Sequence, residues 1–256
     1  MEGIVTSPET SQPVAEGPRL NFVQRLVGAF ISPQETFEDI NRKGSWLGIF
    51  LIIAVLATTM SYLPQRLMDH ETYMRKALEM NPMTRKLPED QIQKIVEQPQ
   101  SAFQKYSTII LAPVGLLVVY AICAAALLLI FVLMGGGLNF KKSMTFTLWG
   151  MAPPGLVGSL LAILFMFTKD PDSLEVDPSA NVVSNLGHLV SAKENGVLHS
   201  LLTSIDLFTA WTIFLLSIGF SIASGGKLSK GKAAVGVLVA WGIYVLGKVG
   251  FAAIFS

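Results

Sequence analysis

The end of the chain decides the fold. It reads LLTSIDLFTAWTIFLLSIGFSIAS at residues 201–224, GGKLSKGK at 225–232 and AAVGVLVAWGIYVLGKVGFAAIF at 233–255. Each of the two apolar runs is long enough to cross the hydrocarbon core of a bilayer, which takes about 20 residues. Neither run alternates in polarity as a barrel strand does, so both are expected to be helices. The pattern predicts a helical hairpin in a membrane, with a short turn of glycine and lysine between its arms.

The composition of the whole chain also predicts a membrane protein, with several spans. Of its 256 residues, 51% are hydrophobic and 14% are charged, whereas a soluble domain has about 25% charged residues. The net charge of +1 argues against binding to nucleic acid, which needs a strongly basic surface. Residues 1–19 are polar and lack the apolar centre of a signal peptide. We therefore expect a disordered tail at 1–19, followed by one membrane domain over residues 20–256.

Five segments predict an all-α bundle of five transmembrane helices, at about 46–63, 108–134, 143–167, 204–223 and 233–255. Pro64 is expected to close the first of them. The segment between the first two spans has helical periodicity at 65–80 and 89–97, and prolines separate these pieces. We expect this segment to form a solvated cap over the span ends; a separate binding module is the alternative.

Two short helices are expected before the first span. An apolar stripe within residues 20–31 predicts a helix that lies at the membrane surface or packs on the protein's own spans. The stripe consists of Phe22, Val23, Leu26, Val27 and Phe30. Ser32 and Pro33 fit the N-cap and first residue of a second helix, over about 33–41. Glu35 stands at the capping-box position of that helix.

The third span contains the sequence WGMAPPGLVG, in which Pro153 and Pro154 each lack a backbone N–H. Their position frees the carbonyls of Trp149 and Gly150, so the helix is expected to be kinked or broken inside the membrane. Broken spans at membrane depth sometimes mark a substrate site. The alternative is a packing kink that neighbouring helices repair.

Two charged residues lie within the last two spans. Asp206 is about one turn inside the fourth span and Lys248 is about two turns before the end of the fifth. A charge at the centre of a bilayer is costly, and the short turn between the spans brings both residues toward the same face. We therefore predict that they are linked, directly or through one water. In the alternative interpretation, Lys248 reaches the headgroups and Asp206 caps its helix.

The sequence offers no group with the chemistry of a catalytic, cofactor-binding or metal site. His70, His188 and His199 do not have metal-ligand spacing, and Cys123 lies alone in an apolar run. Residues 226–233 nearly fit a phosphate-binding loop but lack the Ser or Thr that would hold magnesium. We therefore expect a protein that is not an enzyme and uses no cofactor.

Four short patterns resemble one family. They are Ser32-Pro33-x-x-x-Phe37, Trp46 at the first span, SIDLFTAW ending at Trp211, and the final WGIYVLGKVGFAAIF. Together they resemble the bacterial branch of the Yip1-domain membrane proteins over about residues 20–256. The resemblance implies a five-helix bundle with a cytosolic N-terminus. Eukaryotic members bind Rab-type GTPases in vesicle traffic, but their DLYGP signature is absent here, so GTPase binding is not inferred.

Two functions follow as hypotheses. The first is a membrane protein that organises the membrane or partner proteins, including copies of itself, in a bacterial cytoplasmic membrane; a trafficking role follows only by analogy. The alternative is a small transporter or permease subunit with a site near Pro153 and Pro154. The short loops carry Lys141, Lys142, Lys227, Lys230 and Lys232 and no acid. These charges predict an N-terminus inside and a C-terminus outside.

Overall fold

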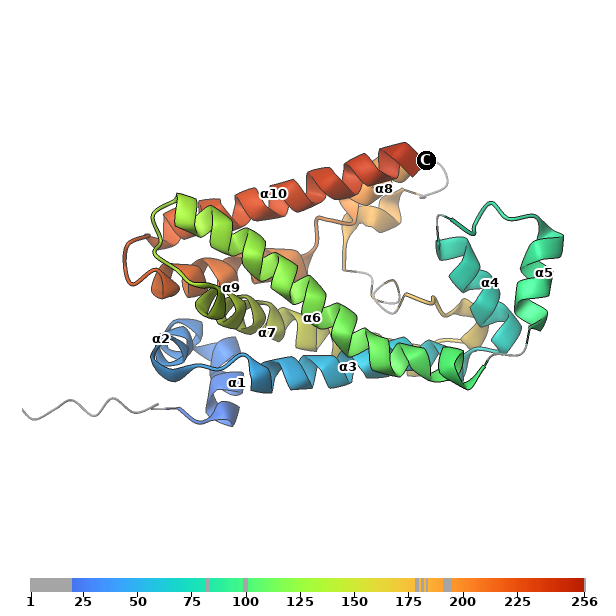
Figure 1. Cartoon of the computed structure of the whole chain (residues 1–256), viewed down its shortest axis with the longest axis horizontal. Coiled ribbons are helices and arrows are strands. Elements are labelled where there is room, and N and C mark those ends of the chain that lie inside the picture. Colours follow the sequence, from blue (N-terminus) through green and yellow to red (C-terminus); the bar gives the residue numbers. More distant parts are fainter. Residues whose placement is uncertain are drawn as a thin grey trace, which may run out of the picture.

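The computed structural model describes residues 20–255 except 82, 99–100, 178–179, 181, 183 and 191–194. The expected tail at 1–19 lies outside these residues. The described part of the chain is helical and contains no strand, only an isolated bridge between Asn185 and Asp206. This confirms the all-α class (Figure 1).

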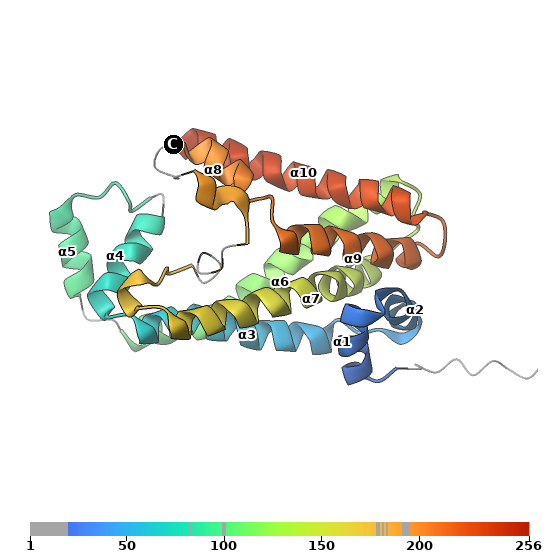
Figure 2. The ribbon, with the colours of Figure 1, turned by 180° about the vertical axis from the view of Figure 1, so that it is seen from behind.

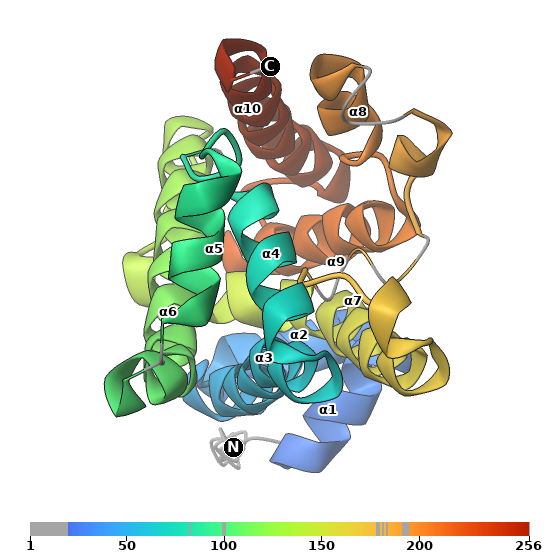
Figure 3. The ribbon, with the colours of Figure 1, turned by 90° about the vertical axis from the view of Figure 1, so that its right-hand side faces the viewer.

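Five long or central helices run along the length of the molecule. They are α3 (Leu47–Leu67), α6 (Ala102–Leu133), α7 (Phe140–Thr168), α9 (Leu207–Ala223) and α10 (Lys230–Phe255). Helix α9 packs between α7 and α10, as an end-on view shows (Figure 3). Helix α10 lies at the edge of the bundle, because only 11% of its apolar window is buried, against 39% in α7.

The shorter helices gather at the two ends of the bundle (Figures 1 and 2). One end carries α1 (Phe22–Ile31), α2 (Pro33–Lys43) and the connections at 134–139 and 224–229. We call it the basic end. The other end carries α4 (His70–Met80), α5 (Glu89–Glu97), η1 (Pro171–Ser173), η3 (Leu186–Leu189) and α8 (Gly196–Leu202). We call it the cap end.

Four helices are long and apolar enough to cross a membrane, so the prediction of five spans is confirmed only for four. The four candidate spans are Leu47–Leu67, Ile109–Leu133, Phe140–Thr168 and Lys230–Ile254. The expected fourth span, 204–223, is instead the 17-residue helix α9. At 1.5 Å per residue α9 is about 25 Å long, which is short of a hydrocarbon core of about 30 Å.

Local signals at both ends explain why α9 is short. Asp206 is its N-cap, so helical hydrogen bonding begins only at Leu207. Gly225 and Gly226, with φ of 66° and 81°, turn the chain just after its last residues. A positive φ suits glycine because it has no side chain to clash there. All residues from Leu215 to Phe220 are buried, so protein rather than lipid surrounds this half of α9.

Helix α7 is continuous through Pro153 and Pro154, so it is not broken there, and the expected kink stays a prediction. Most residues from Ser143 to Pro154 are buried, and the surrounding helices hold the α7 backbone in place despite two missing donors. The indole Nε1 of Trp149 donates to the carbonyl of Ser45 at 3.0 Å. The expected end of the first span at Pro64 is wrong, because α3 continues to Leu67.

The apolar stripe of α1 is divided between the bundle and the surface. The exposed fractions of Val23 and Val27 are 64% and 52%, whereas Arg25 and Ala29 are the buried residues of this helix. A soluble surface helix would bury its apolar side. Here Leu26 packs against the core, and Phe22 and Phe30 pack edge-on against tryptophans of the bundle. The helix therefore packs on the protein's own spans and leaves two valines exposed.

The expected cap helices are present in the segment after the first span. Helix α5 has the bounds predicted from periodicity, Glu89–Glu97, and α4 covers most of the other predicted piece. Lys76 Nζ of α4 donates to the carbonyls of Asp172 and Leu174 at 2.9 and 2.7 Å. These bonds join the cap segment to the chain after α7, rather than leaving it as a detached module.

Candidate functional site

The Ser-Pro motif forms the junction of α1 and α2. Ser32 is the N-cap of α2 and Pro33 its first residue, as predicted. The Ser32 side chain makes no capping hydrogen bond, so the capping box expected with Glu35 is not formed. A capping box occurs instead at the start of α1, between Asn21 and Gln24.

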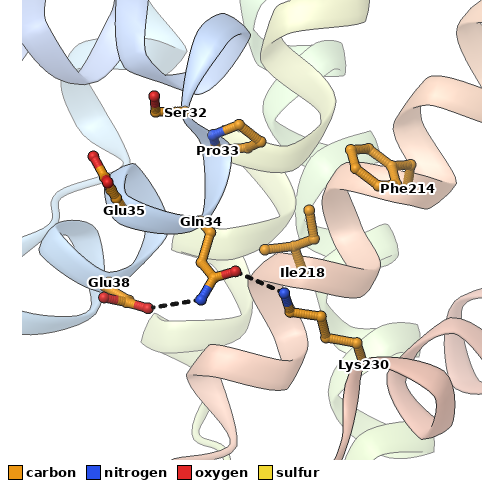
Figure 4. A pocket seen from close by; sticks show the side chains of 8 residues that line it. All are labelled: Ser32, Pro33, Gln34, Glu35, Glu38, Phe214, Ile218 and Lys230. Carbon is orange, nitrogen blue, oxygen red and sulfur yellow. Dashed lines mark hydrogen bonds between the residues drawn. The ribbon is translucent and has the colours of Figure 1, made fainter.

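A groove of about 720 Å³ opens beside this motif, between α2, α9 and the first turn of α10. It is lined by Ser32, Pro33, Gln34, Glu35, Glu38, Phe214, Ile218 and Lys230. Figure 4 shows Gln34 and Lys230 pointing toward one another across it. Lys230 Nζ donates to Gln34 Oε1 at 2.6 Å, and Gln34 Nε2 donates to Glu38 Oε1 at 3.2 Å.

The chemistry of this groove is mixed. One wall, on α2, carries the carboxyl groups of Glu35 and Glu38, and the opposite wall carries the ammonium group of Lys230. Phe214 contributes apolar surface and has 57% of its area exposed. Interfaces for protein partners combine an apolar centre with a polar rim in this way. No pair of groups in it is arranged for acid–base chemistry.

Phe37, the third motif residue, fixes the position of α2 and lies outside the groove. Its side chain is fully buried, and its ring centroid lies 6.0 Å from that of Phe146. Gly219 of α9 allows this approach: a Cβ there would lie 3.1 Å from Phe146 and 3.7 Å from Phe37. Trp211 packs edge-on against Phe30 of α1 at 5.9 Å. The motif thus joins α1 and α2 to the bundle.

A second cavity of about 320 Å³ brings together two of the predicted intramembrane residues, Pro154 and Asp206. It lies among α3, α6, α7 and the start of α9, and its other polar groups are Tyr120, Ser159, Ser184, Thr209 and Thr212. Pro153 is buried within α7, and neither it nor Lys248 lines the cavity.

Asp206 and Lys248 form no direct ion pair in the described part of the chain, and their predicted link through one water stays a prediction. The Asp206 carboxylate instead accepts hydrogen bonds from the backbone N–H and the hydroxyl of Thr209, at 2.8 and 2.6 Å. Lys248 Nζ donates to Thr203 Oγ1 at 2.7 Å and Ser204 Oγ at 3.2 Å. Asp206 is therefore bonded within the first turn of α9, whereas Lys248 is bonded to the turn that precedes it.

The histidines have structural surroundings where the structure describes them. His199 Nδ1 lies 2.8 Å from the Val190 carbonyl and 3.2 Å from that of Gly187. Within the described residues, no group of three or more His, Cys, Asp or Glu side chains could hold a metal ion. Cys123 is a half-buried thiol in α6.

Sequence reasoning missed a buried ion pair between the two N-terminal helices. Arg25 Nε of α1 donates to Asp39 Oδ2 of α2 at 2.7 Å, and the two side chains are only 10% and 5% exposed. Arg25 Nη1 also donates to the carbonyl of Lys43 at 3.4 Å. The sequence signal for this pair was a single charged residue, Arg25, in an otherwise uncharged and largely apolar helix.

A comparison with models of protein families gives a match over most of the chain. Residues 27–251 match the model of a protein family described as the Yip1 domain. The match begins within α1 and ends in the last turns of α10. Comparisons with curated proteins and with solved structures give no significant match.

Proposed function

The chain belongs to the Yip1 family, and from this premise we propose that it is a non-enzymatic multi-pass membrane protein that organises other membrane proteins. Its several apolar helices support residence in a lipid bilayer. The proposed membrane is the bacterial cytoplasmic membrane, with the N-terminus inside and the C-terminus outside. Support for this orientation is that both short basic connections and the flank of α3 lie at one end of the bundle (Figure 1).

The observation that carries the proposal is the groove beside the Ser-Pro motif. It is wide, it opens at the surface, and α2 presents two carboxylates along its edge. The α2 wall is held rigidly because Phe37 and Ile40 are buried in the bundle. A rigid wall that offers both exposed charge and exposed apolar surface suits recognition of a protein, since little conformational freedom is lost on binding.

A small transporter or permease subunit is the second candidate, and the cavity at Pro154 and Asp206 favours it. The continuity of α7 weakens this candidate, because discontinuous helices usually supply the free backbone groups of such sites. Asp206 is also committed to capping α9. A carboxylate that already accepts two hydrogen bonds has less capacity for a substrate.

Photo-crosslinking in native membranes tests the first candidate. A benzoyl-phenylalanine at Phe214, in the groove, should give a discrete protein adduct. The same substitution at Phe167, 63% exposed at the cap end of α7, is the matched control and should give no such adduct. Glu38→Lys should weaken the adduct by changing the charge of the α2 wall.

The identity of the adduct and a transport assay separate the alternatives. An adduct made of two copies of this chain would show that the partner is a second copy and that the protein forms a homo-oligomer. Substrate-dependent flux into liposomes that Asp206→Asn abolishes, together with no adduct at Phe214, would instead establish the transporter.

A further inference from the structure

A third cavity, of about 450 Å³, lies at the basic end between the end of α2 and the first turn of α7. It is lined by Ile40, Asn41, Arg42, Lys43, Gly44, Asn139, Lys141, Lys142, Thr145 and Phe146. Its walls come from segments about a hundred residues apart in the chain. The burial of Ile40 and Phe146 holds these segments together.

Four of its lining side chains are cations and none is an acid. Where the structure describes possible partners, Arg42, Lys43, Lys141 and Lys142 form no ion pair with them. The nearby Asp39 is buried and already bonded to Arg25. The cavity therefore concentrates positive charge that the acidic side chains of the described residues do not neutralise, and such a site attracts an anion.

Other features of this region reinforce the attraction. Asn139 is the N-cap of α7, so the positive end of a 29-residue helix dipole lies at the same place. The chain leaves the cavity at Gly44 and enters the first candidate span at Leu47, with Trp46 between them. Tryptophan is typical of the level of lipid headgroups, so the cavity is expected at the level of the membrane surface.

Exposed apolar side chains follow the cavity along the chain, at the start of α3. On α3, Leu47, Leu51 and Val55 follow one another at the spacing of one helical face and are 51%, 55% and 67% exposed. Acyl chains can cover this surface while a headgroup occupies the cavity above it. A free phosphate ion would satisfy the charges but leave the apolar surface uncovered.

We propose that this basic cavity binds the phosphate of an anionic phospholipid headgroup from the adjoining leaflet. Basic pockets between membrane helices bind anionic headgroups by the same chemistry. The bound lipid would bridge the end of α2 and the start of α7. This site is separate from the groove at Phe214, and its occupancy does not depend on the function proposed for that groove.

The test uses the full-length protein in phosphatidylcholine nanodiscs that contain a low fraction of fluorescent phosphatidylglycerol. The test variant is Lys141→Gln with Lys142→Gln. The matched control is Lys227→Gln with Lys232→Gln, which removes the same charge at the same end from residues that do not line the cavity. Thermal unfolding of each protein in neutral lipid establishes that both variants are folded.

Binding of the labelled lipid should fall about tenfold or more in the cavity variant and less than twofold in the control. Because headgroup binding here is partly electrostatic, the wild-type signal should also decrease with salt. An equal loss in both variants would overturn the proposal, since it would mean general attraction to a basic surface. Displacement of the lipid by millimolar inorganic phosphate would assign the cavity to a soluble anion instead.

Discussion

Different kinds of contact stabilise the two ends of the bundle. At the basic end, α2 buries four residues, including Phe37 and Ile40, and the ion pair between Arg25 and Asp39 is shielded from water. At the cap end, α4 has no buried residue. Apolar burial contributes far more than exposed ion pairs to stability. The basic end is therefore the rigid part of the molecule, and the groove and the basic cavity share its helix α2.

The cap end has a small apolar cluster of Met68, Met166 and Leu174, against which Tyr73 of α4 packs. Polar contacts at the surface join α4 to α5. Arg75 bonds to Glu71 at 3.0 Å and to Glu89 at 2.6 Å. The carboxylate of Glu89, followed by that of Glu71, raises the pKa of Arg75. Hydrogen bonds from the side chain and then the backbone of Thr72 lower the pKa of Asp69, the N-cap of α4. Contacts of this kind keep helices together at the surface but are screened by salt.

The largest expected effect is at Phe37. Phe37→Ala removes a ring that is fully buried against Phe146 and should reduce the free energy of unfolding in detergent by about 3–5 kcal/mol. Phe167→Ala removes an exposed ring at the cap end of α7 and should leave it nearly unchanged. Denaturant titration of both variants measures the difference. Equal losses would show that the basic end is not the better packed one.

A smaller effect on the free energy of unfolding is expected for the buried ion pair between Arg25 and Asp39. A double-mutant cycle with Arg25→Met and Asp39→Leu should give a coupling of about 1–3 kcal/mol, because each single change leaves a buried charge without its partner. This coupling should persist in high salt because the pair is shielded from water. Additive losses for these two residues would mean that the pair does not hold α1 to α2.

The smallest effect is expected at the cap end. Arg75→Ala should increase hydrogen exchange in α4 and α5 without changing the midpoint of global unfolding, since its partners are solvent-exposed. Salt should produce the same local change in the wild type. A lowered global midpoint in Arg75→Ala would show that the cap end folds cooperatively with the bundle.

Apolar length and periodicity predicted most of the fold. Four span predictions and the helix at Glu89–Glu97 depend on patterns of many residues, which a single proline or charge does not overturn. The errors at prolines fall where tertiary contacts override a local rule. Pro64, Pro153 and Pro154 do not end their helices, because the surrounding bundle holds the backbone in place.

The candidate sites were less predictable. The sequence singled out Ser32, Pro33, Pro154 and Asp206, and each lines a cavity. The predicted link between Asp206 and Lys248 was based on their similar depth in the membrane. Depth does not reveal that each of them bonds to a nearby hydroxyl group instead. The convergence of Arg42 and Lys43 with Lys141 and Lys142 depends on how α2 packs against α7, which no local pattern contains.

We propose that the basic end, with α1, α2 and both charged cavities, is the cytoplasmic face. Site-specific labelling with a membrane-impermeant maleimide tests it directly. In a Cys123→Ala background, one cysteine replaces Lys227 at the basic end and another replaces Asp172 at the cap end, in separate proteins. Both native residues are exposed.

Lys227→Cys should react in inside-out membrane vesicles and stay unlabelled in intact spheroplasts, whereas Asp172→Cys should show the opposite pattern. This result would place the groove and the basic cavity in contact with the cytoplasm and its leaflet. Labelling of Lys227→Cys from outside the spheroplasts, or of both positions from the same side, would contradict the account.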